Sequence, residues 1–266
     1  MTTSLPFFSV ITSTHLRAEL LRRALLSLRA QTFQDFEMIV VADAMDAGTG
    51  AVVAELLREN DTFVKRSGAP GPAHSRNLGM QLARGEWVVF LDDDDSFRPH
   101  HLQAMHDQAL RSRTHVLYSG YEVLTEDREQ PGIPPLGHTP VPLDGFAPES
   151  VHVKNFIPNN ALVYRRVALA GCSVDPHLAS QEDWDFLLGV CARSAPVHVP
   201  GGGAVVHKDY VNAGTRRGTA ASSNDSNVVA DFLHVYRRWP APTPALQQQR
   251  KDLLKSAGLD LPAIWF

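Results

Sequence analysis

Cysteine is scarce in this sequence, with two residues in 266, Cys172 and Cys191. They form no CxxC pair, so a disulfide framework is not expected and a reducing compartment is the simpler interpretation. Residues 1–9 lack the basic region and apolar core of a secretory signal. No run reaches the roughly 18 apolar residues that a membrane span needs. We therefore expect a cytoplasmic protein, with a peripheral contact at the inner face of the cell membrane left open.

A basic surplus is also absent, because the formal net charge is −4. Proteins that bind a phosphate backbone usually carry an excess of lysine and arginine, so nucleic acid is not expected as a partner. Hydrophobic residues make up 44% and charged residues 20% of the chain, as is ordinary for a globular enzyme. The length suits one large α/β domain or two small ones. None of this predicts an oligomeric state.

The first 120 residues alternate between short apolar runs and segments with helical spacing. This alternation predicts a parallel sheet covered by helices on both faces. Ligands of such sheets bind beyond the carboxyl ends of the strands, so the segments after Thr12, Ala42 and Leu91 are the places to search. The predicted strands are 7–12, 36–42, 62–65 and 86–91, and the predicted helices are 16–30, 49–59 and 73–83.

The second half of the chain is less regular. Six prolines between residues 131 and 148 predict a long loop, because proline donates no ladder hydrogen bond and disfavours helix before it. Beyond the loop we expect a strand at 160–166 and helices at 181–192, 228–238 and 243–256. We therefore expect a main domain over residues 1–219, in two halves that meet at about residue 98, and a C-terminal helical extension (220–266).

The strongest chemical signal is a run of four aspartates, Asp92 to Asp95, directly after the predicted strand 86–91. Adjacent like charges cost free energy unless a cation or water separates them. Carboxylate oxygens suit hard cations such as Mg²⁺ or Mn²⁺. A solvated acidic turn that caps the next helix is the competing interpretation, but the position at a strand's carboxyl end favours a cation site.

Two further candidates lie in the first half. Arg76 follows a Gly/Pro turn at 68–72 and opens a predicted helix. A guanidinium can fork onto phosphate oxygens, and a helix N-terminus attracts anions, so Arg76 is a phosphate candidate or else a plain surface arginine. Asp43 follows the strand 36–42 and is a binding residue, a loop acid or a helix cap.

In the second half, Glu182 and Asp183 begin the predicted helix 181–192. Acids in a first turn usually just compensate the helix dipole. The same pair can supply a general base that the helix holds in place. His207 follows an apolar run and is either structural or part of a site.

The order and spacing of these segments resemble the family 2 glycosyltransferases with the GT-A fold. The resemblance runs from about residue 10 to about residue 210, and the block 76–95 is its most specific part. It departs from the family pattern after the second strand, where Ala42 replaces an acid. The segments that carry it are VITS (10–13), QTFQDFE (31–37), SRNLG (75–79), the stretch 83–95 ending in EWVVFLDDDD, EDWD (182–185) and His207.

The resemblance implies an α/β GT-A (nucleotide-diphospho-sugar transferase) fold, with a mostly parallel central sheet flanked by helices and a C-terminal helical appendage. It also implies a metal-dependent, inverting hexosyltransferase, with a nucleotide-binding half at about 1–98 and an acceptor-binding half at about 99–219. The expected donor is a nucleotide-diphosphate sugar, and among these a UDP-sugar is expected first. The expected acceptor is a hydroxyl of a glycan or lipid-linked glycan, in bacterial surface polysaccharide synthesis.

The same resemblance assigns roles to single residues. Asp183 is the implied catalytic base. Mn²⁺ or Mg²⁺ is the implied cofactor, with Asp94 and His207 as ligands and Asp92 or Asp95 as alternative ligands. The implied donor-nucleotide residues are Thr12, Ser13, Asp43, Arg76, Asp92 and Asp93, and the implied acceptor or supporting residues are Glu182, Trp184 and Asn160.

Three other functions compete with a glycosyltransferase. A nucleotide-sugar pyrophosphorylase would need a Gly-rich phosphate loop after the first strand, where residues 13–17 read STHLR. A dinucleotide oxidoreductase would need GxGxxG there, and the only glycine cluster, 201–203, opens no evident helix. A non-catalytic carbohydrate- or nucleotide-binding module with a divalent metal site would keep the acidic run but need no base at Asp183. This module is the alternative to a transferase.

Overall fold

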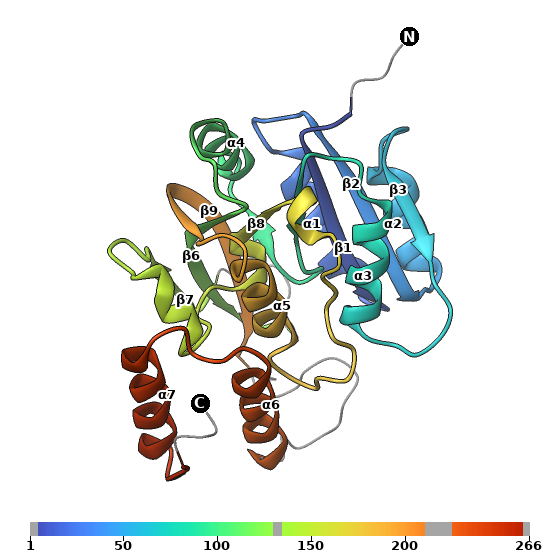
Figure 1. The fold of residues 1–266 in the computed structure, drawn as a ribbon. Coiled ribbons are helices and arrows are strands. Elements are labelled where there is room, and N and C mark those ends of the chain that lie inside the picture. The colour runs from blue at the N-terminus through green and yellow to red at the C-terminus, as the bar shows by residue number, and fades with distance from the viewer. Residues whose placement is uncertain (1–4, 130–134, 211–224, 263–266) are drawn as a thin grey trace.

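The computed structural model describes residues 5–129, 135–210 and 225–262, with the backbone alone for 225–227. One nine-stranded sheet crosses the molecule in the order β3-β2-β1-β4-β8-β6-β9-β5, and β7 pairs with β6 alone (Figure 1). The strands are β1 (Phe8–His15), β2 (Phe36–Ala44), β3 (Thr62–Lys65), β4 (Trp87–Phe90), β5 (Ser96–Phe97), β6 (Val116–Glu126), β7 (Gly137–Val141), β8 (Leu162–Arg165) and β9 (Val197–Asp209).

The first four strands confirm the predicted parallel arrangement. Strand β1 pairs in parallel with β2 and β4, and β2 pairs in parallel with β3. Strands β1, β2 and β4 are almost wholly buried, as strands covered on both faces should be, whereas the edge strand β3 is only partly buried. The helices α1 (Ala18–Arg29), α2 (Ala47–Leu56) and α3 (Pro72–Leu82) connect them. Gly79 of α3 lets that helix lie directly on Ile11, since an added Cβ would come 2.3 Å from its Cγ2.

Beyond β4 the sheet becomes mixed, which alternation in the first half alone does not predict. Strand β8 pairs antiparallel with both β4 and β6, whereas β6 and β9 run parallel. His207 lies inside β9, not after a strand, and the glycines 201–203 belong to the same strand. Residues 160 and 161 lie in the short helix η2 (Asn159–Ala161), so the predicted strand begins at Leu162.

The proline-rich segment is not a plain loop, and that expectation was wrong. Strand β7 lies within it, followed by the 3₁₀ helix η1 (Pro148–His152). Pro140 sits opposite Glu122 of β6. Strand β7 is an edge strand that pairs on one side only, so proline's missing donor is tolerated there. Pro131 and Pro134 lie outside the described residues.

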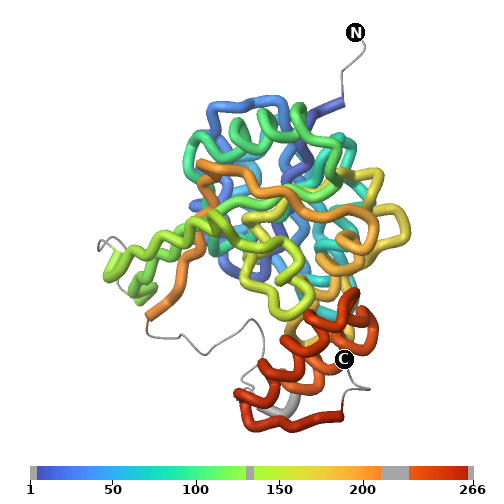
Figure 2. Tube along the Cα trace, turned by 60° about the vertical axis from the view of Figure 1, so that its left-hand side comes forward, coloured from blue at the N-terminus to red at the C-terminus, as the bar shows by residue number. Residues whose placement is uncertain are grey.

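The predicted C-terminal helices are confirmed as α6 (Asp225–Arg238) and α7 (Pro244–Ser256). Thr243 caps α7 by accepting a bond from the amide of Leu246, with Pro244 at the first position. Both helices lie together at the end of the molecule opposite the N-terminus (Figures 1 and 2), and Tyr236 and Leu254 join the main core. Among the helices that the structure describes, none is long and apolar enough to cross a membrane.

Three helices hold the backbone of residues 151–153 through consecutive carbonyl oxygens, an arrangement called here the carbonyl clamp. The oxygen of residue 151 accepts from Trp184 Nε1 at 2.6 Å, that of residue 152 from Arg250 Nε at 2.6 Å, and that of residue 153 from Tyr236 OH at 2.7 Å. The three donors are fully buried and come from α5 (Glu182–Cys191), α7 and α6. Buried carbonyls need partners, so the clamp fixes this segment.

Candidate active site

A cleft of about 690 Å³ opens beyond the carboxyl ends of the first strands, where an α/β sheet is expected to bind its ligand. It brings together parts of the chain that are far apart in sequence. From the first half come the segment just after β1, the start of α3 and the acidic run. From the second half come the segment after η1, the start of α5, and Phe232 in the middle of α6. Its lining includes Arg17, Arg76, Asp92, Asp94, Asp95, Arg128, Lys154, Asn155, Asn159, Gln181, Glu182, Asp183 and Phe232.

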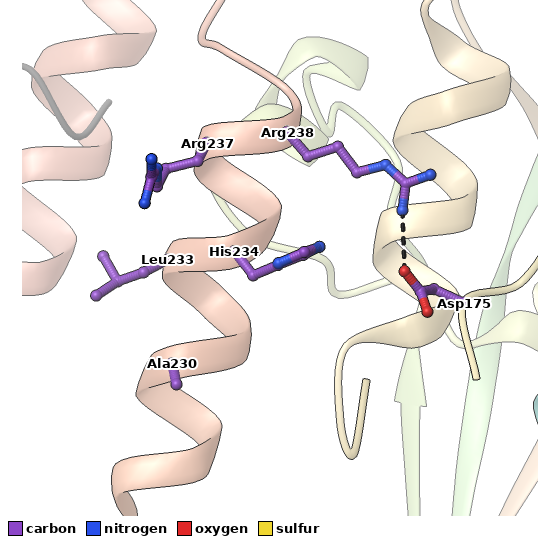
Figure 3. Close-up of a pocket in the computed structure, with 6 residues that line it drawn as sticks. All are labelled: Asp175, Ala230, Leu233, His234, Arg237 and Arg238. Carbon is purple, nitrogen blue, oxygen red and sulfur yellow. Dashed lines mark hydrogen bonds and ion pairs between the residues drawn. The ribbon is translucent and has the colours of Figure 1, made fainter. Parts of the chain in front are cut away.

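A second hollow, of about 750 Å³, lies between α6 and the loop that carries Asp175 (Figure 3). Its lining shares no residue with the cleft. Its one carboxylate, Asp175, already accepts a bond from Arg238 at 3.2 Å. None of the residues with predicted chemical roles lines it, so the cleft is the candidate site.

Arginine side chains neutralise the acidic run. Arg17, just beyond β1, donates to the fully buried Asp93 and to Asp94 Oδ2, the latter at 3.0 Å. Arg128 lies 3.5 Å from the same Asp94 oxygen. The side chains of Asp92 and Asp94 remain 31% and 26% exposed and line the cleft, whereas Asp93 does not. Asp92 and Asp94 are therefore the most accessible members of the run, whereas Asp95 lines the cleft but is only 8% exposed.

Asp95 is turned toward the second half of the sheet. Its oxygens accept from the backbone amide of His207 at 2.9 Å and from Nδ2 of Asn160 at 3.0 Å. Burial, together with the charges of Asp92 and Asp94, raises the pKa of the Asp95 carboxyl well above its usual range. Asn160 thus holds the Asp95 carboxylate in place, and Asp95 connects the acidic run to β9.

His207 has a partner at each ring nitrogen. Nε2 lies 2.8 Å from Ser96 Oγ, and Nδ1 lies 3.1 Å from Glu126 Oε2. Burial, followed by the positive charge of Arg23, lowers the pKa of the imidazole. The backbone amide of His207, rather than its ring, contacts Asp95, and the role of His207 as a metal ligand stays a prediction.

Arg76 links the acidic run to α5. It is 6% exposed and donates to Asp92 Oδ1 at 2.8 Å and to Glu182 Oε1 at 3.2 Å. Its guanidinium therefore holds one carboxylate of the acidic run and one of α5. Its predicted contact with the donor remains a prediction.

Asp183 lines the cleft at the start of α5. Burial and the neighbouring charge of Glu182 raise its pKa to about 6, against the lowering effect of Arg76. Its Oδ1 accepts a bond from the amide of Trp184 at 2.7 Å. The ring of Trp184, the next residue in α5, is fully buried. Asp183 can therefore exchange a proton near neutral pH.

Asp43 lies near the end of β2. In the sheet, β1 separates β2 from β4 and the acidic run that follows it. Asp43 is within 2.6 Å of His15 Nδ1, and it accepts from the Gly71 amide at 2.7 Å. Its pKa is lowered by these bonds and by Arg66, which outweigh the effect of burial. Thr12 is 1% exposed, with no hydrogen-bond partner for its Oγ1, and Ser13 is also buried. None of the three lines the cleft, so their predicted contact with the nucleotide base remains a prediction.

Sequence reasoning missed Arg17, Arg128 and Lys154, which also line the cleft. A signal existed for Arg17, because it follows the carboxyl end of the first strand, where ligands are expected. Arg128 and Lys154 lie in irregular segments, and only the folded chain places them here.

The cleft's donor set fits a hard divalent cation. Asp92 and Asp94 offer exposed carboxylate oxygens on one turn. Among residues 5–129, 135–210 and 225–262, no three acidic, histidine or cysteine side chains converge into a complete site. Mg²⁺ and similar ions commonly take one or two carboxylates and complete their shell with substrate phosphates and water, so two carboxylates suffice.

The mixed α/β sheet, with an acidic turn after β4 and a carboxylate at the start of α5, is the arrangement that the resemblance to GT-A glycosyltransferases led us to expect. Residues 9–165 match glycosyl transferase family 2, more than half of the chain, and the protein belongs to that family. It is a glycosyltransferase. Helices α5, α6 and α7 lie outside the matched segment.

Two relatives and one solved structure are similar to the chain. The GalNAc(5)-diNAcBac-PP-undecaprenol beta-1,3-glucosyltransferase of Campylobacter jejuni is 36% identical over 115 residues, which are 42% of this chain but only 37% of that enzyme. WcaA of Escherichia coli, provisionally named a colanic acid biosynthesis glycosyl transferase, is 26% identical over 88% of this chain and 81% of its own length. The mannosyltransferase PcManGT of Pyrobaculum calidifontis, in complex with GDP-Man and Mn²⁺, superposes with a TM-score of 0.62 at 19% identity, covering 98% of this chain and 78% of its own.

Proposed function

We propose that this protein transfers a sugar from a nucleotide-diphosphate sugar to a hydroxyl of a glycan or lipid-linked glycan, with inversion and with Mn²⁺ or Mg²⁺ bound. One observation carries the proposal: Asp183 lines the same cleft as the exposed carboxylates of Asp92 and Asp94. A general base and a cation-binding turn in one cleft are the two parts that such a transfer needs. We expect a UDP-sugar as the donor.

In the proposed reaction, Asp183 accepts the proton of the acceptor hydroxyl while that oxygen attacks the sugar's C1. The bond from C1 to the diphosphate breaks as the new glycosidic bond forms. Because the attack comes from the face opposite the leaving group and no protein nucleophile intervenes, the configuration at C1 inverts. A pKa near 6 leaves most Asp183 side chains ionised, and able to accept a proton, at neutral pH.

The donor end of the cleft combines acids with arginines. Asp94, with Asp92 or Asp95, would hold the divalent cation, which when bound offsets the charge of the leaving diphosphate. Arg17 and Arg128 both reach Asp94 and could turn their guanidinium groups to phosphate oxygens. Thr12, Ser13, Asp43 and Asp93 would shape the nucleoside end of the site.

The relatives support the proposed setting. The Campylobacter enzyme is named for a lipid-linked glycan acceptor, and WcaA for colanic acid biosynthesis. We extend to this chain the role of adding one sugar to a bacterial surface glycan. The proposed division of labour places the donor on residues 1–98 and the acceptor on residues 99–219, with α6 and α7 in support.

A panel of UDP- and GDP-sugars tests the proposal. Each donor is incubated with Mn²⁺ and a mixture of glycan acceptors, and nucleotide release and product mass are measured. We expect transfer from at least one donor, and product of inverted anomeric configuration by NMR. Nucleotide binding without any transfer across the panel would instead favour a non-catalytic binding module, and retained configuration would exclude the mechanism.

A further inference from the structure

One cation in the cleft has no counter-charge. Arg17, Arg76 and Arg128 each pair with carboxylates within 3.5 Å. Lys154 lines the same cleft, is exposed, and has no carboxylate within ion-pair distance among the side chains that the structure describes. The positive charge of Lys154 is therefore available to an anionic group of a ligand.

The carbonyl clamp places Lys154 in the cleft. The clamped residues 151–153 precede it directly, and Trp184, which holds the first of them, also follows Asp183 in α5. The catalytic helix and the segment that carries Lys154 are therefore fixed to each other through one buried side chain. A lysine at the end of a fixed backbone is a better recognition group than one on a free loop, because less chain entropy is lost when it binds.

An aromatic ring lies on the same cleft. Phe232 of α6 is half-buried and packs its ring 4.9 Å from that of Trp184 and 5.9 Å from that of Tyr236. These contacts fix the ring, while part of it remains at the cleft surface. A fixed aromatic ring offers an apolar surface against which the C–H groups of a sugar ring can pack.

Two amides complete the group. Asn155 uses its Oδ1 to accept from the Ile157 amide at 3.0 Å, which directs its Nδ2 donors elsewhere. Asn159 is 7% exposed, lines the cleft, and its Oδ1 has no hydrogen-bond partner. Buried polar atoms are rarely left without partners, so this oxygen is free to accept a bond from a donor placed beside it.

We propose that Phe232, Lys154 and the two amides form the acceptor subsite, and that it takes a sugar carrying an anionic oxygen group, phosphate or carboxylate, beside the ring. The sugar packs on Phe232, the anion pairs with Lys154, and the reacting hydroxyl faces Asp183. This inference rests on the proposed transferase function and adds the acceptor's charge class to it. The subsite uses α6, which lies outside the family-matched residues 9–165.

Binding of small probes tests the subsite without turnover. Glucose 1-phosphate, methyl glucuronide and methyl glucoside are titrated by calorimetry into the free enzyme and into enzyme saturated with UDP or GDP and Mn²⁺. We expect at least one charged probe to bind ten-fold or more tightly than the neutral one in both states. Whichever charged probe binds identifies the anion as phosphate or carboxylate. Equal affinity for all three, or no binding, would overturn the inference.

Two variants separate the roles of charge and ring. Lys154→Gln should weaken the charged probe about ten-fold and leave the neutral probe and the nucleotide unchanged. Phe232→Leu should weaken charged and neutral probes alike. Lys251→Gln, on α7 and outside the cleft, is the matched control for loss of a lysine. Loss of nucleotide affinity in Lys154→Gln would assign the lysine to the donor instead and refute the subsite.

The donor panel keeps the two proposals distinguishable. If sugar transfer occurs but neutral acceptors are used as well as charged ones, the subsite is wrong and the transferase function stands. If no donor reacts while the charged probe still binds through Lys154, the subsite stands and the transferase function fails.

Discussion

Arg76 donates its Nη2 to Oδ1 of Asp92 at 2.8 Å, although 16 residues separate the two in the chain. The contact ties the first turns of α3 to the acidic turn that follows β4. The same guanidinium also donates to Oε1 of Glu182 at 3.2 Å, so Arg76 connects the acidic turn to the start of α5. It also supplies the positive charge that limits the rise in the pKa of Asp183.

Removing that charge should change the pH dependence of catalysis. With Arg76 present, burial and Glu182 raise the pKa of Asp183 to about 6. In Arg76→Gln the lowering contribution is lost, so the pKa rises further and the base stays protonated to higher pH. We expect the acidic limb of the kcat profile to move upward from about pH 6. An unchanged limb, measured with a transferred donor, would contradict this.

Arg76→Gln should also weaken donor binding and lower stability. The free energy of unfolding should fall by roughly 1–3 kcal/mol, because two carboxylates lose a charged partner. Arg22→Gln, which breaks an exposed pair with Glu55, is the control and should do much less. If Arg76→Gln binds nucleotide with wild-type affinity, the assignment of Arg76 to the donor fails.

Asp183→Asn should separate catalysis from binding. The amide keeps the shape of the carboxyl but cannot accept the acceptor's proton, so turnover should fall by about 10²–10⁴-fold. Nucleotide affinity, measured by calorimetry, should remain near wild type, since the proposed donor contacts lie elsewhere. Glu182→Gln is the neighbouring control and should reduce turnover less, through its bond to Arg76. Retained transfer in Asp183→Asn would leave the base unassigned.

Nucleotide binding should require a divalent cation. A diphosphate entering beside Asp92 and Asp94 meets like charge unless a cation lies between them. We expect UDP or GDP to bind measurably with Mn²⁺ and at least ten-fold more weakly in EDTA. Asp94→Asn should weaken the Mn²⁺-dependent part selectively. Equal affinities with and without the metal would show that Arg17 and Arg128 suffice.

Gly79→Ala tests how α3 is seated. A Cβ there would lie 2.3 Å from Cγ2 of Ile11, so the helix must move away from β1. We expect a loss of roughly 1–3 kcal/mol in unfolding free energy, as for other overpacked cores. Gly50→Ala in α2 is the control, since its Cβ would meet only the end of the Met45 side chain, at 3.1 Å. Equal effects in denaturant titrations would contradict the packing argument.

Local patterns predicted much of this molecule from sequence. The first four strands, α1 to α3, the start of α5 and the Thr243 cap follow from periodicity and capping residues within a few positions. The acidic run was recognisable because four adjacent acids follow a buried strand. Each of these signals is contained in one short segment, which is why reading along the chain suffices.

Contacts between distant segments were not predictable in the same way. Arg17 pairs with Asp93 across 76 positions, and nothing near Arg17 indicates that partner. The parallel pairing of β6 with β9 joins strands with several elements between them. Strand β7 forms despite its proline, because a strand that pairs on one side only does not need every backbone N–H as a donor. Tertiary context decides all three.

The carbonyl clamp has a consequence for chimeric enzymes. Its three donors, on α5, α6 and α7, lie beyond the segment that defines the family, yet they grip residues 151–153 inside that segment. A graft that exchanged only α5, α6 and α7 between two homologues would set these three carbonyls against donors from the other protein. Such a chimera should therefore exchange residues 151–159 together with the helices, so that the carbonyls and their donors come from the same protein.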